Sequence, residues 1–267
     1  MLSQLSKAIT VLLFFVAFGI VAVGQPANGS GSLSSKAFVG ETLKYEGKIR
    51  KLTVGIDVAD LTFTVSKGTS DGLVIKTEAI SKGTLLKMFR YSFLQQYESI
   101  VDQDLRILKT TKHDVQKERV RDSEATFDYG QKRVTFVETD PKDLMRPPRK
   151  IASEIVSPMF DIVSGIYYLR LQPLVVGKRF DVNVSDSGLV YKVPVVVAGV
   201  EQLKTVIGKV SCYRLEPEIF GPGRLIEEKG KMIIWIADDA KRTPVKGQID
   251  SQYGKIEVKL QSVAWAK

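Results

Sequence analysis

The chain has 267 residues, of which 44% are hydrophobic and 26% charged, so its composition is that of a globular protein and not of a disordered one. Its formal net charge of +9 favours contact with anionic surfaces. Cys212 is the single cysteine, which excludes an internal disulfide and a thiol-rich metal site. Because Cys212 lies in an apolar strand pattern, we expect a buried, inert thiol.

The N-terminus has the pattern of a secretory signal peptide. Lys7 is the one charge before an apolar run from Ile9 to Val23, and the small residues Ala22 and Gly24 precede Gln25. The alternative is a membrane anchor, but a run of about fifteen residues is short for a span that needs roughly 20. We expect residues 1–24 to be cleaved, leaving a charge of 9 − 1 = +8. The mature chain is then periplasmic or extracellular, with no transmembrane span and no nucleic-acid partner.

Residues 25–38 are rich in Gly, Ser and Asn, which predicts a flexible spacer before a single β-rich domain at 39–267. Period-two alternation predicts strand after strand, as in Leu61, Phe63 and Val65. Turns are predicted at 69–72, at 185–188 and at Gly208-Lys209. Pro194 interrupts a long strand pattern and predicts an edge or a bulge there.

One segment, residues 157–171, predicts a principal α-helix. Ser157 suits the N-cap and Pro158 the first helical position. Apolar residues recur at helical spacing behind them, whereas Arg170 lies on the apolar side and needs a partner. One helix among many strands predicts a curved antiparallel meander, either a curled sheet or an incomplete barrel, wrapped around that helix.

The segment 139–150 contains Pro141, Pro147 and Pro148, which exclude regular structure and predict a loop. The loop is either a solvated connector or a lip that binds anionic headgroups or polymers. The candidates for anionic contact are Lys142, Arg146, Arg149 and Lys150.

Several ordered motifs together resemble an exported bacterial family catalogued as domain of unknown function 3108. The motifs are Gly40-Glu41-x-Leu43-x-Tyr45, Asp161-x-x-Ser164-x-x-Tyr167-x-x-Arg170, Leu174-Val175-Val176-Gly177-Lys178, Lys204-Thr205-Val206-Ile207-Gly208-Lys209, the stretch from Trp235 to Val245, and the strand Gly254–Leu260. The resemblance covers roughly residues 40–264 and implies an envelope protein with a curved antiparallel sheet and a helix. In outline this shape is similar to periplasmic lipoprotein carriers. No characterised activity comes with the family.

The side chains that could carry chemistry are sparse. His113 is the only histidine and lies in a polar, basic stretch, so it predicts a surface residue and not a catalytic base. Asp238-Asp239 predicts a stabilised turn, or a carboxylate partner for Arg170. No catalytic residue, metal site or cofactor is predicted. The candidate ligand-binding or structural residues are Asp161, Ser164, Tyr167, Arg170, Trp235, Asp238, Asp239 and Arg242.

These patterns predict a non-enzymatic envelope protein that binds an apolar or amphiphilic ligand, such as a lipid, between sheet and helix. The alternative is a structural or protein-interaction module that uses exposed sheet edges, and a filled core without a cavity would favour it. A hydrolase is the third reading, and it would require several carboxylates converging in a cleft.

Overall fold

The structure, a computed structural model, describes residues 33–51, 54–83, 86, 92–251 and 254–266. It is one 14-stranded antiparallel sheet in the order β8-β7-β6-β5-β4-β3-β2-β1-β14-β13-β12-β11-β10-β9. The strands are β1 (Glu41–Lys51), β2 (Val54–Lys67), β3 (Leu73–Ser81), β4 (Phe93–Val101), β5 (Ile107–Gln116), β6 (Arg119–Asp128), β7 (Arg133–Thr139), β8 (Arg149–Glu154), β9 (Arg179–Asp186), β10 (Leu189–Thr205), β11 (Gly208–Pro217), β12 (Gly230–Ala237), β13 (Pro244–Ser251) and β14 (Gly254–Trp265).

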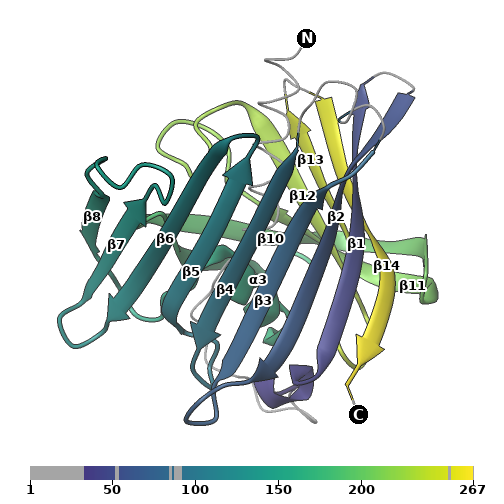
Figure 1. The fold of residues 1–267 in the computed structure, drawn as a ribbon. Helices are drawn as coiled ribbons and strands as arrows, with labels where there is room; N and C mark the ends of the chain where they lie inside the picture. The colour runs from purple at the N-terminus through teal and green to yellow at the C-terminus, as the bar shows by residue number, and fades with distance from the viewer. Residues whose placement is uncertain (1–32, 52–53, 84–85, 87–91, 252–253, 267) are drawn as a thin grey trace.

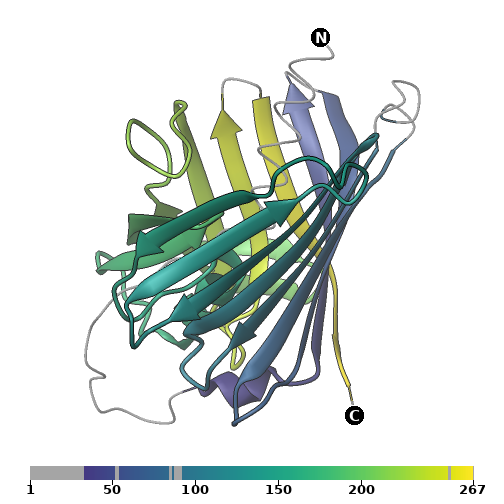
Figure 2. The same cartoon turned by 60° about the vertical axis from the view of Figure 1, so that its left-hand side comes forward.

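The sheet curls but does not close. β1 pairs with β14 near its centre, and β8 and β9 are its two ends. Figure 1 shows the half from β1 to β8 in front, and Figure 2 shows it twisting steeply across the other half. A twisted sheet of this many strands must curve to cover one apolar face. The predicted curved antiparallel meander is therefore confirmed.

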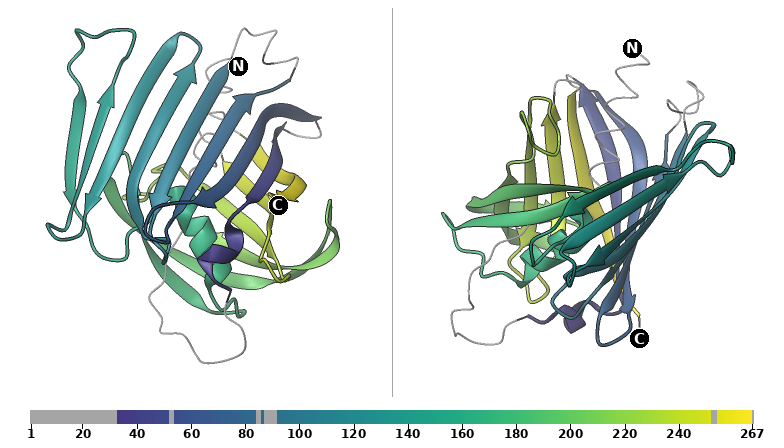
Figure 3. Two further views of the ribbon diagram at one scale, coloured as in Figure 1. Left: turned by 60° about the horizontal axis from the view of Figure 1, so that its bottom comes forward. Right: turned by 90° about the vertical axis from the view of Figure 1, so that its left-hand side faces the viewer.

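Helix α3 (Ile162–Leu171) lies inside the curl and links β8 to β9. It contacts β3, β4, β9 and the short 3₁₀-helix η1 (Ser35–Phe38). The left view of Figure 3 shows α3 next to η1. Its apolar side chains are buried in the core with those of the sheet, each contributing roughly 1.5–3 kcal/mol. No described helix is long and apolar enough to cross a membrane.

The helix begins later than predicted. Asp161, and not Ser157, is the N-cap: its carboxylate accepts hydrogen bonds from the N–H groups of Val163 and Ser164, both at 2.7 Å. Residues Ser157 and Pro158 precede the helix and are joined by a cis peptide bond. The intervening Phe160 instead bonds β9, since its N–H donates to the carbonyl of Asn183 at 3.1 Å.

The ordered fold also begins earlier than the predicted domain start at residue 39. Ser34 caps η1, and the Phe38 side chain is completely buried. The predicted signal peptide and the first part of the spacer lie outside the described residues.

Most of the predicted turns are present. The N–H of Gly72 donates to the carbonyl of Thr69 at 2.9 Å between β2 and β3. Pro194 lies where β10 pairs with β9 alone, just before β11 joins at Val195. The turn predicted at Gly208-Lys209 was wrong, because Thr205 pairs with Gly208 and the turn residues are Val206 and Ile207.

The turn between β9 and β10 brings the two ends of the sheet into contact. Gly188 in this turn has a φ of +80°, and a Cβ added to it would lie 2.5 Å from Cβ of Phe136 in β7 and 3.1 Å from the side chain of Ile151 in β8. The two ends of the sheet are therefore held together by packing of the β9–β10 turn on β7 and β8, and not by hydrogen bonds between strands.

Candidate functional site

A buried ion pair holds the C-terminal half of α3. The Nη1 and Nη2 atoms of Arg170 donate to the two carboxylate oxygens of Glu41 in β1, each at 2.6 Å. Both side chains are 0% exposed. Arg170 also donates to the carbonyl of Lys241, from Nε at 3.2 Å and from Nη2 at 3.0 Å. This two-bond geometry satisfies a guanidinium that would otherwise be costly to bury.

Two aromatic rings cover the guanidinium of this pair. Its carbon lies 4.0 Å from the ring centroid of Phe38 and 4.8 Å from that of Tyr167. Burial lowers the pKa of Arg170, but the hydrogen bonds and charge of Glu41 outweigh it, and the pKa is raised overall. Burial raises the pKa of Tyr167 well above its usual value. The cluster ties η1, β1, α3 and the β12–β13 loop together.

The predicted partners of Arg170 were wrong, since neither Asp238 nor Asp239 contacts it. Asp239 instead accepts hydrogen bonds from the N–H groups of Lys241 and Thr243, at 3.1 and 3.0 Å, and from the Thr243 hydroxyl at 2.9 Å. The turn that the sequence predicted here is therefore real. It fixes the position of the Lys241 carbonyl that Arg170 binds, whereas the side chain of Asp238 is exposed.

Asp161 and Ser164 are fully buried at the opposite end of α3. Together they form a capping box, in which the Asp161 N–H donates to the Ser164 hydroxyl at 3.2 Å. Burial raises the pKa of Asp161, and the opposing effects of Ser99 and of the helix N–H groups are smaller. These two candidate residues therefore begin the helix and do not meet Arg170.

Substitutions of Asp161 test how much its carboxylate contributes to stability as the N-cap of α3. We expect Asp161→Asn to change the free energy of unfolding by less than about 1 kcal/mol at neutral pH, and Asp161→Ala to cost about 1–2 kcal/mol. Because the pKa of Asp161 in the folded chain is raised above 3.8, its contribution to stability is present at acid pH and lost as pH rises through the folded pKa. Urea unfolding across that range should show wild type losing stability relative to Asp161→Asn. Parallel profiles would contradict this.

Of the remaining candidates, Trp235 interacts with residues of β10 and β13, and Arg242 with β11 and the C-cap residue of α3. The indole N–H of Trp235 donates to Glu201 at 2.8 Å, and the Lys246 ammonium lies 4.4 Å from the Trp235 ring centroid. Arg242 lies over the ring of Tyr213 and donates to the carbonyl of Gln172 at 3.3 Å. The eight predicted residues therefore do not form one site, and most of them serve packing, capping or turn formation.

The described apolar side chains of the sheet and of α3 pack together in one buried core. A cavity of about 40 Å³ lies there, lined by Tyr45, Phe63, Ile166, Tyr167 and Met232 among others. The hydroxyl of Tyr45 donates to the Pro244 carbonyl at 2.8 Å, and burial raises the Tyr45 pKa well above its usual value. A space of this size holds a water molecule or two, not a lipid chain.

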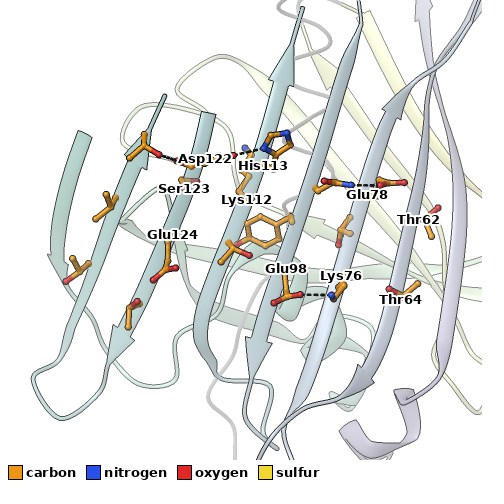
Figure 4. A pocket seen from close by; sticks show the side chains of 18 residues that line it. Thr62, Thr64, Lys76, Glu78, Glu98, Lys112, His113, Asp122, Ser123 and Glu124 are labelled. Carbon is orange, nitrogen blue, oxygen red and sulfur yellow. Dashed lines mark hydrogen bonds and ion pairs between the residues drawn. The ribbon is translucent and has the colours of Figure 1, made fainter. Parts of the chain in front are cut away.

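A much larger hollow of about 1130 Å³ lies on the outer, solvent-facing side of β2 to β7. Figure 4 shows the threonine, acidic, basic and histidine side chains that line it. Many are already paired: Lys76 with Glu98 at 2.9 Å, Gln96 with Glu78 at 2.8 Å, and His113 with Asp122 at 2.5 Å. No cluster of His, Cys, Asp or Glu in the described part of the chain could hold a metal ion. This hollow is a polar, salt-bridged part of the sheet surface that can offer hydrogen bonds to polar molecules.

Cys212 is buried, as predicted, and burial raises the pKa of its thiol to about 11.

The loop between β7 and β8 is ordered by two tight turns. The N–H of Asp143 donates to the Asp140 carbonyl, and the N–H of Arg146 to the Asp143 carbonyl, both at 3.1 Å. Arg121 forms an ion pair with the Asp140 carboxylate, and the Lys142 ammonium donates to the carbonyl of Glu118 at 2.9 Å. The second turn therefore carries Leu144 and Met145 at its two central positions.

Sequence reasoning identified the basic residues of this loop but missed its apolar tip. Leu144 and Met145 are 89% and 90% exposed. Gly, Pro, Asn, Asp and Ser dominate turn centres, so two large apolar residues there are unusual. The detectable signal was an adjacent Leu-Met pair inside a charged, proline-rich segment. Lys142, Arg146, Arg149 and Lys150 are all exposed around it.

Comparison with known proteins establishes the family. The model for a protein of unknown function, DUF3108, matches residues 42–261. No curated protein matches the chain. A Brucella abortus structure, described as a beta-barrel-like protein of domain of unknown function DUF1849, is 11% identical with a TM-score of 0.61, covering 86% of this chain and 99% of that one.

Two further solved structures have TM-scores of 0.31, and no conclusion rests on them. A candidate lipoprotein of Parabacteroides distasonis is 10% identical over 85% of this chain and 95% of that one. A porin-like protein of Bacteroides uniformis is 6% identical over 84% and 96%. The family match spans most of the sequence, including α3 and nearly all of the sheet described above. The chain therefore belongs to the DUF3108 family of proteins of unknown function.

Proposed function

We propose that this chain is an exported, non-enzymatic protein of the bacterial envelope that docks on anionic membrane surfaces through the loop at 140–148 and the first two residues of β8. The observation that carries the proposal is the tip formed by Leu144 and Met145, which is almost fully exposed between the exposed basic residues Lys142 and Arg146, with exposed Arg149 and Lys150 following in the sequence. An apolar tip with a cationic surround matches a bilayer interface, where acyl chains lie beneath anionic headgroups.

The expected binding free energies are those of a reversible attachment of the loop to a membrane. Burying a Leu or Met side chain completely is worth roughly 1.5–3 kcal/mol. Each Lys or Arg near an anionic leaflet adds about 1 kcal/mol, and salt screens that part. Lys142 and Arg146 flank the tip in sequence, and Arg149 and Lys150 begin β8 directly behind it. The loop also holds two acidic residues: Asp140 pairs with Arg121, whereas the exposed Asp143 offsets one of the positive charges.

Carriage of an amphiphile between sheet and helix has less support. Pockets for drug-sized ligands measure about 300–1000 Å³, whereas the cavity beside α3 measures about 40 Å³. The filled core favours the reading in which the protein acts through its outer surfaces. The hollow on the outer face of β2 to β7 presents polar groups that are largely paired with one another.

Binding to lipid vesicles tests the proposal. We expect purified protein to bind vesicles containing phosphatidylglycerol and to bind phosphatidylcholine vesicles at least about tenfold more weakly. Replacing Leu144 and Met145 together by serine should weaken binding by at least about tenfold, since two apolar anchors are lost. Arg146→Gln should weaken binding to the anionic vesicles by about fivefold and leave neutral vesicles unaffected.

The matched control replaces Val175 and Val176 by serine, because these neighbours are another exposed apolar pair, at 60% and 54%. This control should bind the vesicles as wild type does. Equal binding by the Leu144/Met145 variant and wild type, or an equal loss in the control, would overturn the assignment of the loop.

A further inference from the structure

The edge strand β8 has no described strand paired to its outer side, although the β9–β10 turn packs on the side chain of Ile151. Ile155, just beyond β8, donates its N–H to the carbonyl of Lys132 at 2.9 Å, in register with the β7–β8 ladder. Because antiparallel hydrogen bonding alternates along a strand, the odd-numbered residues of β8 bond β7. The N–H and C=O groups of Lys150, Ala152 and Glu154 therefore point away from β7, and the side chains of all three are exposed.

The other end of the sheet is not open in the same way. The segment before α3 covers part of β9: Phe160 donates to the carbonyl of Asn183 at 3.1 Å and accepts from the N–H of Ser185 at 2.9 Å. No described residue makes such a backbone bond to the free side of β8. Natural proteins usually cover an edge or interrupt it, so an uncovered one is a ready template for another strand.

The sequence of β8 is complementary to itself in the antiparallel sense. If Ala152 of one copy lies opposite Ala152 of a second, Lys150 of each copy faces Glu154 of the other. A two-fold axis requires such a register, in which a residue pairs with its own equivalent. It also makes Ala152, Lys150 and Glu154 the hydrogen-bonded residues, which are those whose backbone groups already point outward.

The side chains agree with this register. Lys150 lies opposite Val137 and Glu154 opposite Arg133 on β7, so both belong to the outer face of the sheet, with Ala152 between them. Neither Lys150 nor Glu154 has an ion pair with another described residue. Charges on an edge normally discourage pairing, but opposite charges placed symmetrically about a small residue favour it.

We propose that β8 is a homodimer interface, in which two copies of this chain join their sheets through antiparallel β8–β8 pairing centred on Ala152. The contact is one short strand from each copy, so the dimer is expected to be weak and concentration-dependent. Lys150 is also one of the basic residues assigned to membrane docking, but this inference does not rest on the apolar tip: it rests on the backbone of β8 and on the paired charges of Lys150 and Glu154.

Analytical ultracentrifugation over a wide concentration range tests the proposal. Wild type should show a reversible monomer–dimer equilibrium. Ala152→Pro should be monomeric, since it removes an outward N–H while leaving the β7–β8 ladder intact, and its melting temperature should stay near that of wild type. Lys150→Glu should weaken association by at least about tenfold, because the two-fold axis turns both attractive pairs into repulsive ones.

The combination of Lys150→Glu with Glu154→Lys exchanges the charges and should restore the dimer. A monomeric wild type at the highest concentrations, a dimer that persists unchanged in Ala152→Pro, or no restoration by the exchanged pair would each overturn the proposal.

Discussion

Replacing Arg170 by methionine is expected to lower the free energy of unfolding by about 3–5 kcal/mol, because it leaves the Glu41 carboxylate buried without its partner. The change also removes two hydrogen bonds to the Lys241 carbonyl and the cation between Phe38 and Tyr167. Methionine fills much of the same volume, so the loss reports the unpaired charge more than a cavity. Chemical denaturation at neutral pH measures it directly.

Two further variants separate the stability effect of the Arg170–Glu41 ion pair from that of the surrounding core. Adding Glu41→Gln to Arg170→Met should recover part of the loss, since the buried charge is then gone. Arg224→Met is the surface control: Arg224 pairs with the half-exposed Glu218 at 3.4 Å, and its loss should cost about 1 kcal/mol or less. If Arg170→Met is as stable as wild type, the buried pair does not hold α3 in place.

The second large effect is expected at Gly188. Gly188→Ala should destabilise the fold by about 2–4 kcal/mol, since a positive φ disfavours any side chain and the new Cβ would lie 2.5 Å from Cβ of Phe136. The matched control is Gly177→Ala. Gly177 has nearly the same φ, +84°, and a Cβ there meets nothing within 4 Å.

The difference between these two glycine variants isolates the contact that joins the two ends of the sheet. Gly188→Ala should be less stable than Gly177→Ala by about 1–3 kcal/mol in thermal or chemical unfolding. Equal losses would mean that backbone strain accounts for both, and that the β9–β10 turn does not pack tightly on β7 and β8.

The sheet could be predicted from the sequence because its signal is local. Alternation such as Leu61, Phe63 and Val65 places side chains on one face of one strand, and that face is buried. Turn chemistry was also local where glycine needed a positive φ, as at Gly188. At 205–208 the same reasoning failed, since the pairing of Thr205 with Gly208 places Val206 and Ile207 in the turn despite their poor turn preference.

The start of the helix shows two local signals in competition. Ser157 and Pro158 satisfy the usual rules for a helix start, but so do Asp161 and Ser164, which form the capping box. Tertiary structure decides between them: Phe160 bonds to β9, and this leaves Asp161 as the first position free to cap.

The partner of Arg170 could not be read from the sequence, although the need for one could. Glu41 precedes Arg170 by 129 positions, and only the folded sheet brings the first residue of β1 beneath the C-terminal turn of α3. The exposure of Leu144 and Met145 could not be predicted from the sequence either. Leu144 and Met145 look like ordinary core residues until the loop is seen to hold them away from the core.

The native mass spectrum of the protein, purified without detergent and paired with lipid extraction of the same sample, tests the account most directly. If α3 and the Arg170–Glu41 cluster fill the curl as described, the spectrum should show the mass of the polypeptide alone, or of two copies, and the extract should contain no stoichiometric lipid. One tightly held lipid per chain, retained by the Leu144/Met145 serine variant, would contradict it and place a ligand inside the curl.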